Sequence, residues 1–209
     1  MKLNTVLAAA LLAGTAAGPA LAVVVPSYPD PGTQNTVTYT FTAATTGEID
    51  AYFLGSGATY DEQLGLLVNG VPTGVVGLDN HSTPDGTMLD LGSVDAGDTL
   101  TFFIAVSTTG ATWYSDPSKN LDGAGGTTSN LIYSTSFAGG AFGSNVVPAG
   151  TYVGFEDLPA NDGSDFNYTD EQFAFTNVST ASSVPEPAGL ALFAAGLALV
   201  GAMARRRRR

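Results

Sequence analysis

Apolar and polar residues alternate along several short stretches of the chain. The clearest case is residues 36–42, in which valine, tyrosine and phenylalanine occupy every second position and threonines stand between them. Since successive side chains of a strand point to opposite faces, this pattern predicts a strand with one buried and one wet face. Apolar stretches bounded by turn-forming residues predict further strands at 48–54, 64–68, 71–76, 88–91, 99–106, 131–137, 151–155 and 172–178.

One pair of these stretches is joined by a two-residue turn. Asn69-Gly70 separates 64–68 from 71–76, and Asn-Gly is the pair that best suits a type I′ hairpin turn. No helical period of useful length occurs between residues 23 and 183. Many short strands with glycine, proline and asparagine turns are typical of two packed sheets, so we expect an all-β domain, a β-sandwich with a jelly-roll-like outline.

The N-terminal residues 1–22 follow a different pattern. Met1-Lys2 is a short charged start, residues 6–17 are apolar, and Ala20-Leu21-Ala22 has the small-x-small form of a cleavage site. The apolar run is short and rich in small residues, which favours a signal peptide over a first transmembrane helix. We therefore expect export and cleavage after Ala22.

The C-terminal residues 184–209 consist of three consecutive parts. These are Val184-Pro185-Glu186-Pro187, an uncharged run at 188–204 and five arginines at 205–209. A helix of about 17 residues just crosses a bilayer core, and clustered arginines stay on the cytoplasmic side. Five terminal arginines argue against a buried core helix, so the run predicts a single transmembrane helix that serves as an anchor or as part of a sorting signal.

The order and spacing of these three parts resemble the PEP-CTERM sorting signal, over residues 184–209. The resemblance implies processing by an exosortase, a membrane protease-transpeptidase that cuts near Pro185-Glu186-Pro187. It also implies a precursor tethered to the inner membrane through this tail alone. The released protein is then expected at the cell surface or outside the cell.

Without the two ends, residues 23–183 are the one expected folding unit. They contain Lys119 as their only Lys or Arg against eighteen carboxylates, a net charge of −17, whereas the whole chain carries −12. Such a charge repels nucleic acid and anionic lipid, which excludes both as partners. The chain has no cysteine, so no disulfide stabilises the exported domain. A bound cation is the remaining way to stabilise the exported domain.

An acidic, turn-rich segment lies at residues 156–170, between two predicted strands. Calcium takes about six to eight oxygen ligands from carboxylates, amides, carbonyls and water. The candidate ligands are Glu156, Asp157, Asp165, Asn167 and Asp170. Their spacing is not that of an EF-hand, because no glutamate follows a central glycine at the required distance. The alternative interpretation is an acidic turn that only water solvates.

Two pieces of this region resemble the DUF4114 domain, which recurs in exported bacterial proteins that often carry the same tail. They are Gly154-Phe155-Glu156-Asp157-Leu158 with the following Ser-Asp-Phe-Asn-Tyr-Thr-Asp, and Trp113-Tyr114-Ser115-Asp116-Pro117. The resemblance covers about residues 110–178 and favours a cation site. Asn167 and Thr169 stand where the family usually has aspartate and asparagine, which implies a weaker site.

The sequence does not predict an enzyme. Its single histidine, His81, lies in a polar loop, and no Gly-x-Ser-x-Gly elbow is present, which argues against a Ser-His-Asp site. Glu156 and Asp157 are neighbours at the end of a strand and point to opposite faces, so they do not suit a glycosidase pair. Trp113 and Tyr114 are candidate sugar contacts, and the alternative is that Trp113 belongs to the core.

These observations predict an exported, acidic protein with a structural or adhesive role at the cell surface or in the extracellular matrix of a biofilm. The alternative is a carbohydrate-binding, lectin-like module that acts on exopolysaccharide. Exposure of Trp113 and Tyr114 on one concave face would favour that alternative.

Overall fold

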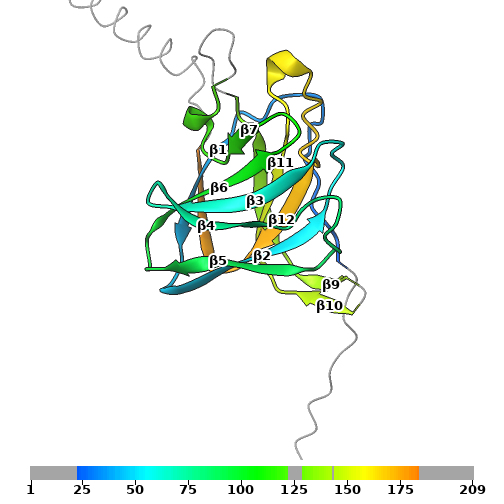
Figure 1. The fold of residues 1–209 in the computed structure, drawn as a ribbon. Coiled ribbons are helices and arrows are strands. Elements are labelled where there is room, and N and C mark those ends of the chain that lie inside the picture. Colours follow the sequence, from blue (N-terminus) through cyan, green and yellow to red (C-terminus); the bar gives the residue numbers. More distant parts are fainter. Residues whose placement is uncertain (1–22, 122–128, 143, 184–209) are drawn as a thin grey trace, which may run out of the picture.

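The computed structural model describes residues 23–121, 129–142 and 144–183 (Figure 1). The expected signal peptide at 1–22 and the tail at 184–209 lie outside the described residues. Within the described ranges, no helix has the length and apolar character needed to cross a membrane. Short 3-10 helices occur at η1, Pro117–Lys119, and η2, Ala160–Asp162.

The first sheet is antiparallel, with the strand order β13-β1-β6-β3-β4, and β7 also pairs with β6. Its strands are β1 Thr38–Ala43, β3 Glu62–Val68, β4 Val71–Gly77, β6 Thr99–Val106, β7 Ala111–Tyr114 and β13 Val178–Ser183. The expected type I′ turn between β3 and β4 is present. Asn69 and Gly70 both have positive φ, at 51° and 81°, as that turn requires.

The second sheet is also antiparallel, with the order β5-β2-β12-β11-β8. Its strands are β2 Gly47–Gly55, β5 Met88–Val94, β8 Ile132–Phe137, β11 Gly150–Phe155 and β12 Glu171–Phe175. A separate two-stranded ribbon is formed by β9 Gly140–Phe142 and β10 Asn145–Val147. In Figure 1 this ribbon lies at the bottom of the molecule, and the loop between β11 and β12 lies at the top.

The two sheets pack face to face on one apolar core. Phe102 of β6 stacks on Phe175 of β12 with ring centroids 3.9 Å apart, and Phe41 of β1 meets Phe102 edge-on at 5.4 Å. The alternation that predicted β1 is visible in its burial, since Phe41 and Ala43 are buried and the neighbouring Thr40 and Thr42 are not. The expected all-β class is confirmed, and the jelly-roll comparison stays a prediction.

The predicted strand 172–178 is confirmed only as far as Phe175, because the chain changes sheets after that residue. β12 ends at Phe175, and Asn177 takes a positive φ of 59° before β13 begins in the other sheet. The Asn177 side chain holds this crossing in place. Its Oδ1 accepts a hydrogen bond from the Thr45 backbone N–H at 2.8 Å, and its Nδ2 donates to the Thr45 carbonyl at 2.9 Å. β13 is consequently an edge strand with mostly exposed side chains.

Candidate cation site

The acidic segment 156–170 connects β11 to β12 at one end of the sandwich (Figure 1). Beside it runs the link 56–61, which carries the chain from β2 in the second sheet to β3 in the first. Two hydrogen bonds join the link to the loop. The Gly57 backbone N–H donates to the Thr169 carbonyl at 2.8 Å, and the Ser56 hydroxyl donates to the Asp170 carbonyl at 2.5 Å. Residues from both sheets therefore meet at this end.

Glu156 organises the loop from within. Its side chain is 1% exposed, and its carboxylate accepts hydrogen bonds from the Ser164 hydroxyl and from the backbone N–H groups of Phe166 and Tyr168. Burial raises the pKa of Glu156, while the hydrogen bonds from Ser164 and Tyr168 lower it and leave a net rise. Three donors thus hold the Glu156 carboxylate in place, and through them it shapes the loop.

Asp165 and Asn167 lie farther out in the same loop and bond mainly to each other. The Asp165 carboxylate accepts from the Asn167 backbone N–H at 3.2 Å and from its Nδ2 at 2.8 Å. Asn167 Oδ1 in turn accepts from the Thr169 backbone N–H at 2.8 Å. Asp165 is exposed. These two predicted ligands therefore form a local turn network of the kind that Asx residues commonly make.

Four other carboxyl groups form what we call the buried carboxylate cluster: Glu62, Asp157, Asp170 and Glu171. Asp157 follows β11, Asp170 and Glu171 lead into β12, and Glu62 begins β3 in the opposite sheet. The Asp157 backbone N–H donates to Asp170 Oδ2 at 2.9 Å. The Asp157 carboxyl also lies next to the carboxyls of Glu62 and Asp170.

Three of the four side chains in the cluster are almost completely buried. Glu62 and Glu171 are both 0% exposed, and Asp157 is 7% exposed. Among the described residues, no N–H or hydroxyl group donates to any oxygen of the Glu62 or Glu171 carboxyls. A buried charge without a partner is so costly that the group takes up a proton instead.

The pKa values reflect this cost. Burial raises the pKa of Glu62 to about 10, and the neighbouring carboxyls of Asp157 and Glu171 add to the rise. Burial and the Glu156 carboxyl raise the pKa of Asp170 to about 8. Burial also raises the pKa of Glu171 well above its ordinary value, with smaller contributions from Asp79 and Asp157. At neutral pH the cluster thus retains protons that a cation can replace.

A cavity of about 350 Å³ opens beside the cluster. The link 57–60 forms one wall, and the acidic loop forms the other, with the carboxyl-bearing residues Glu156, Asp157, Asp165 and Asp170 among its lining. The cavity gives a hydrated ion a route to Asp157 and Asp170. Glu62 and Glu171 do not line it.

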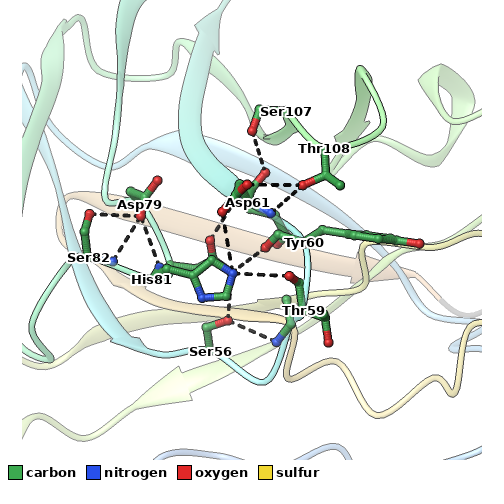
Figure 2. Close-up of polar contacts among 12 residues, drawn as sticks. Ser56, Thr59, Tyr60, Asp61, Asp79, His81, Ser82, Ser107 and Thr108 are labelled. Carbon is green, nitrogen blue, oxygen red and sulfur yellow. Dashed lines mark hydrogen bonds and ion pairs between the residues drawn. The ribbon is translucent and has the colours of Figure 1, made fainter.

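The neighbouring loops are held by a second polar network (Figure 2). His81 Nε2 lies 3.7 Å from Asp61 Oδ1 and 3.3 Å from the Thr59 carbonyl, and Asp79 Oδ1 accepts from the backbone N–H groups of His81 and Ser82 at 3.1 and 3.0 Å. The turn at residues 79–82 is joined to the buried carboxylate cluster through Asn80, whose Oδ1 accepts a hydrogen bond from the Glu62 backbone N–H at 2.9 Å. This network fixes the start of β3.

Trp113 and Tyr114 lie on β7 and are both only partly exposed. Trp113 packs against the main core, and its Nε1 donates to the Asp157 carbonyl at 2.6 Å. Tyr114 lies against Phe103, with ring centroids 5.8 Å apart, and under the Lys119 amine at 5.9 Å. The two side chains therefore do not meet the condition set for a sugar-binding face. Trp113 instead supports the backbone of the acidic segment.

Sequence reasoning missed Glu62 and Glu171 as candidate ligands. Glu62 lies two residues before the predicted strand 64–68, and Glu171 lies directly before the predicted strand 172–178. Their burial was the missing information, and it follows from pairing: Glu171 lies opposite Phe155 of β11, and Glu62 lies opposite Val106 of β6. A carboxylate at the start of an otherwise apolar strand was the available signal.

The comparisons with known proteins concern the tail. Residues 183–209 match the family model described as the PEP-CTERM protein-sorting motif. No curated protein and no solved structure matches the chain. The DUF4114 resemblance over about residues 110–178 therefore stays a prediction. The motif implies an exported protein that an exosortase processes and whose precursor is anchored in the membrane through its C-terminal tail.

Proposed function

We propose that the chain is an exported structural or adhesive component of the cell surface or extracellular matrix, stabilised by calcium and released from its membrane tether by an exosortase. The observation that carries this proposal is the junction of domain and tail. The last strand, β13, ends at Ser183, and the sorting motif spans 183–209. Processing near Pro185-Glu186-Pro187 then leaves every strand of the domain in place.

The acidic end of the sandwich supports the calcium part of the proposal. Asp157 and Asp170 face a cavity through which an ion can enter, and the described residues offer only Lys119 and His81 as possible counter-charges. Lys119 lies over Tyr114, and His81 pairs with Asp61. The DUF4114 resemblance favours the same interpretation. Calcium is common outside cells, and extracellular calcium modules typically bind at about 10⁻⁴ to 10⁻³ M.

The lectin-like alternative receives no such support. It depended on Trp113 and Tyr114 forming an exposed concave face, whereas Trp113 packs on the core and its indole N–H is already used. We therefore assign the protein no sugar site, and any contact with exopolysaccharide is expected to be part of an adhesive surface.

Intact-mass spectrometry of protein extracted from the cell surface tests the sorting part. In cells that contain an exosortase, we expect a chain that begins near Val23 and ends near Val184. In cells without one, the chain should keep Arg209. A Glu186→Ala variant in exosortase-containing cells is the matched control and should also keep Arg209. Recovery of Arg209 in the surface-extracted wild-type chain would reject this part of the proposal.

A further inference from the structure

The buried carboxylate cluster connects the two sheets of the sandwich. Glu62 belongs to β3 of the first sheet, whereas Glu171 begins β12 of the second. Asp157 lies beside carboxyls from both sheets, because its carboxyl neighbours that of Glu62 while its backbone N–H donates to Asp170 Oδ2 at 2.9 Å. A ligand held by all four carboxylates would therefore contact three strand ends that are far apart in sequence.

Glu62 and Glu171 have no N–H or hydroxyl donor among the described residues that would complete a polar network. Buried polar groups are normally hydrogen-bonded, and each exception requires an explanation. Here all four oxygens of Glu62 and Glu171 are unpaired among the described residues, at 0% exposure of both side chains. Apolar residues of similar size would stabilise the same positions better. Buried acidic oxygens that have no donor and lie next to further carboxylates are candidate ligands for a cation.

The type of donor decides which cation fits. The cluster offers only carboxylate oxygens and contains neither histidine nor cysteine, a set that suits hard cations and not zinc. The cluster oxygens do not form a compact set of three within 4.8 Å of one another. Calcium tolerates irregular geometry at about 2.3–2.6 Å, whereas magnesium demands a near-ideal octahedron. Calcium is therefore the better match, with water from the cavity completing its shell.

We propose that Glu62, Asp157, Asp170 and Glu171 bind a calcium ion that links the two sheets across their shared end. This inference rests on the calcium part of the proposed function and changes its ligand set. Glu156 becomes the residue that positions the loop, Asp165 and Asn167 become turn residues, and Glu62 and Glu171 become ligands.

Terbium luminescence in the wild-type chain tests the location of the site without any substitution. Terbium occupies calcium sites and emits when a nearby indole is excited. The chain has a single tryptophan, Trp113, and its Nε1 lies 2.6 Å from the Asp157 carbonyl oxygen. In the full-length chain, purified in detergent and stripped of metal with a chelator, we expect sensitised terbium emission that calcium abolishes by competition. Calcium binding without sensitised terbium emission would place the ion elsewhere.

Calorimetric titration with calcium chloride tests the new ligands. Glu62→Gln and Glu171→Gln preserve side-chain size, and each should weaken calcium binding by about tenfold or more, because each removes a charged ligand. The matched control is Glu48→Gln, an exposed glutamate outside the cluster, which should change the affinity by less than about twofold. Circular dichroism verifies that each variant is folded. If a variant unfolds, the terbium result on the wild type decides.

The outcomes separate this inference from the proposed function. Wild-type affinity in both Glu62→Gln and Glu171→Gln would overturn the inter-sheet site and leave calcium stabilisation intact. No calcium binding by the wild type would overturn both. The mass measurement of the processed chain is independent of either result.

Discussion

Two acidic groups of this protein differ in their surroundings more than in their composition. The surface triad, which we define as Glu48, Asp50 and Asp90, brings three carboxylates from β2 and β5 to within 4.8 Å of one another. Two of the three are exposed, and Asp90 also accepts a hydrogen bond from the Gly92 backbone N–H at 2.8 Å. The buried carboxylate cluster is more widely spaced, yet its two glutamates are fully buried and have no hydrogen-bond donor among the described residues.

The comparison shows that burial, more than spacing, determines how strongly acidic side chains need a ligand. Two like charges about 4 Å apart repel by about 1 kcal/mol in water and several-fold more near or inside a protein. Water and salt can satisfy the surface triad without a bound ion. The buried cluster has only protons or a metal ion to neutralise it. The spacing of the carboxylates alone would select the surface triad as the candidate cation site.

The largest effect should come from varying pH with and without calcium. Glu62 and Asp170 have folded-state pKa values of about 10 and about 8, against about 4 in an unfolded chain. The folded state therefore holds more protons, so the stability that these groups contribute is complete below about pH 4 and is lost as pH rises through the folded pKa values.

In a chelator, we accordingly expect the melting temperature to fall by about 5–10 °C between pH 5 and pH 9. Millimolar calcium should remove most of this fall, since it binds the folded state. Scanning calorimetry in calcium and in sodium at matched ionic strength separates stabilisation by calcium binding from general screening. If sodium restores the melting temperature as well as calcium does, the buried carboxylate cluster behaves like the surface triad. That result would contradict the comparison.

A smaller effect is expected from neutralising one member of each group, and for the buried group its sign should reverse when calcium is added. Without calcium at pH 8, Glu171→Gln should raise the free energy of unfolding by about 1–3 kcal/mol, because it removes an unpaired buried acid. Glu48→Gln in the surface triad should change it by less than about 0.5 kcal/mol. Urea unfolding measures both. With millimolar calcium, Glu171→Gln should instead be less stable than the wild type. If the variant stays more stable than the wild type in calcium, that counts against the buried site.

The smallest effect concerns the loop that supports the buried cluster. Ser164→Ala removes the hydroxyl that donates to Glu156, and the lost hydrogen bond should lower the free energy of unfolding by about 1 kcal/mol. Ser93→Ala, on exposed β5 surface paired with Glu48, should have almost no effect. Urea unfolding of the two variants compares them directly. Equal losses would mean that Glu156 does not organise the loop.

The sequence predicted what depends on neighbours along the chain. The alternation in β1, the Asn69-Gly70 turn and the acidic density of 156–170 are all local signals, and each corresponds to a feature of the fold. Gln172 to Val178 was read as one strand, because no local rule shows that Asn177 bonds to Thr45 and diverts the chain into the other sheet.

The candidate site was predicted only in part, for the same physical reason. Asp157 and Asp170 were found because they share one loop with the other acidic residues. Glu62 comes from a different sheet, and only pairing of β3 with β6 brings it to the same end. Asp165 and Asn167 have a suitable spacing for a metal loop, but their side chains satisfy each other.

The position of β13 also has a mechanical consequence. While the precursor is anchored through its C-terminal tail, any drag on the domain reaches it through this strand, which is held to β1 by register pairs from Thr38↔Ser183 to Ala43↔Val178. A pull along the strand axis loads these pairs together, whereas a pull across it peels them one at a time from Ser183. The edge strand that completes the first sheet is thus the joint through which membrane and domain transmit force to each other.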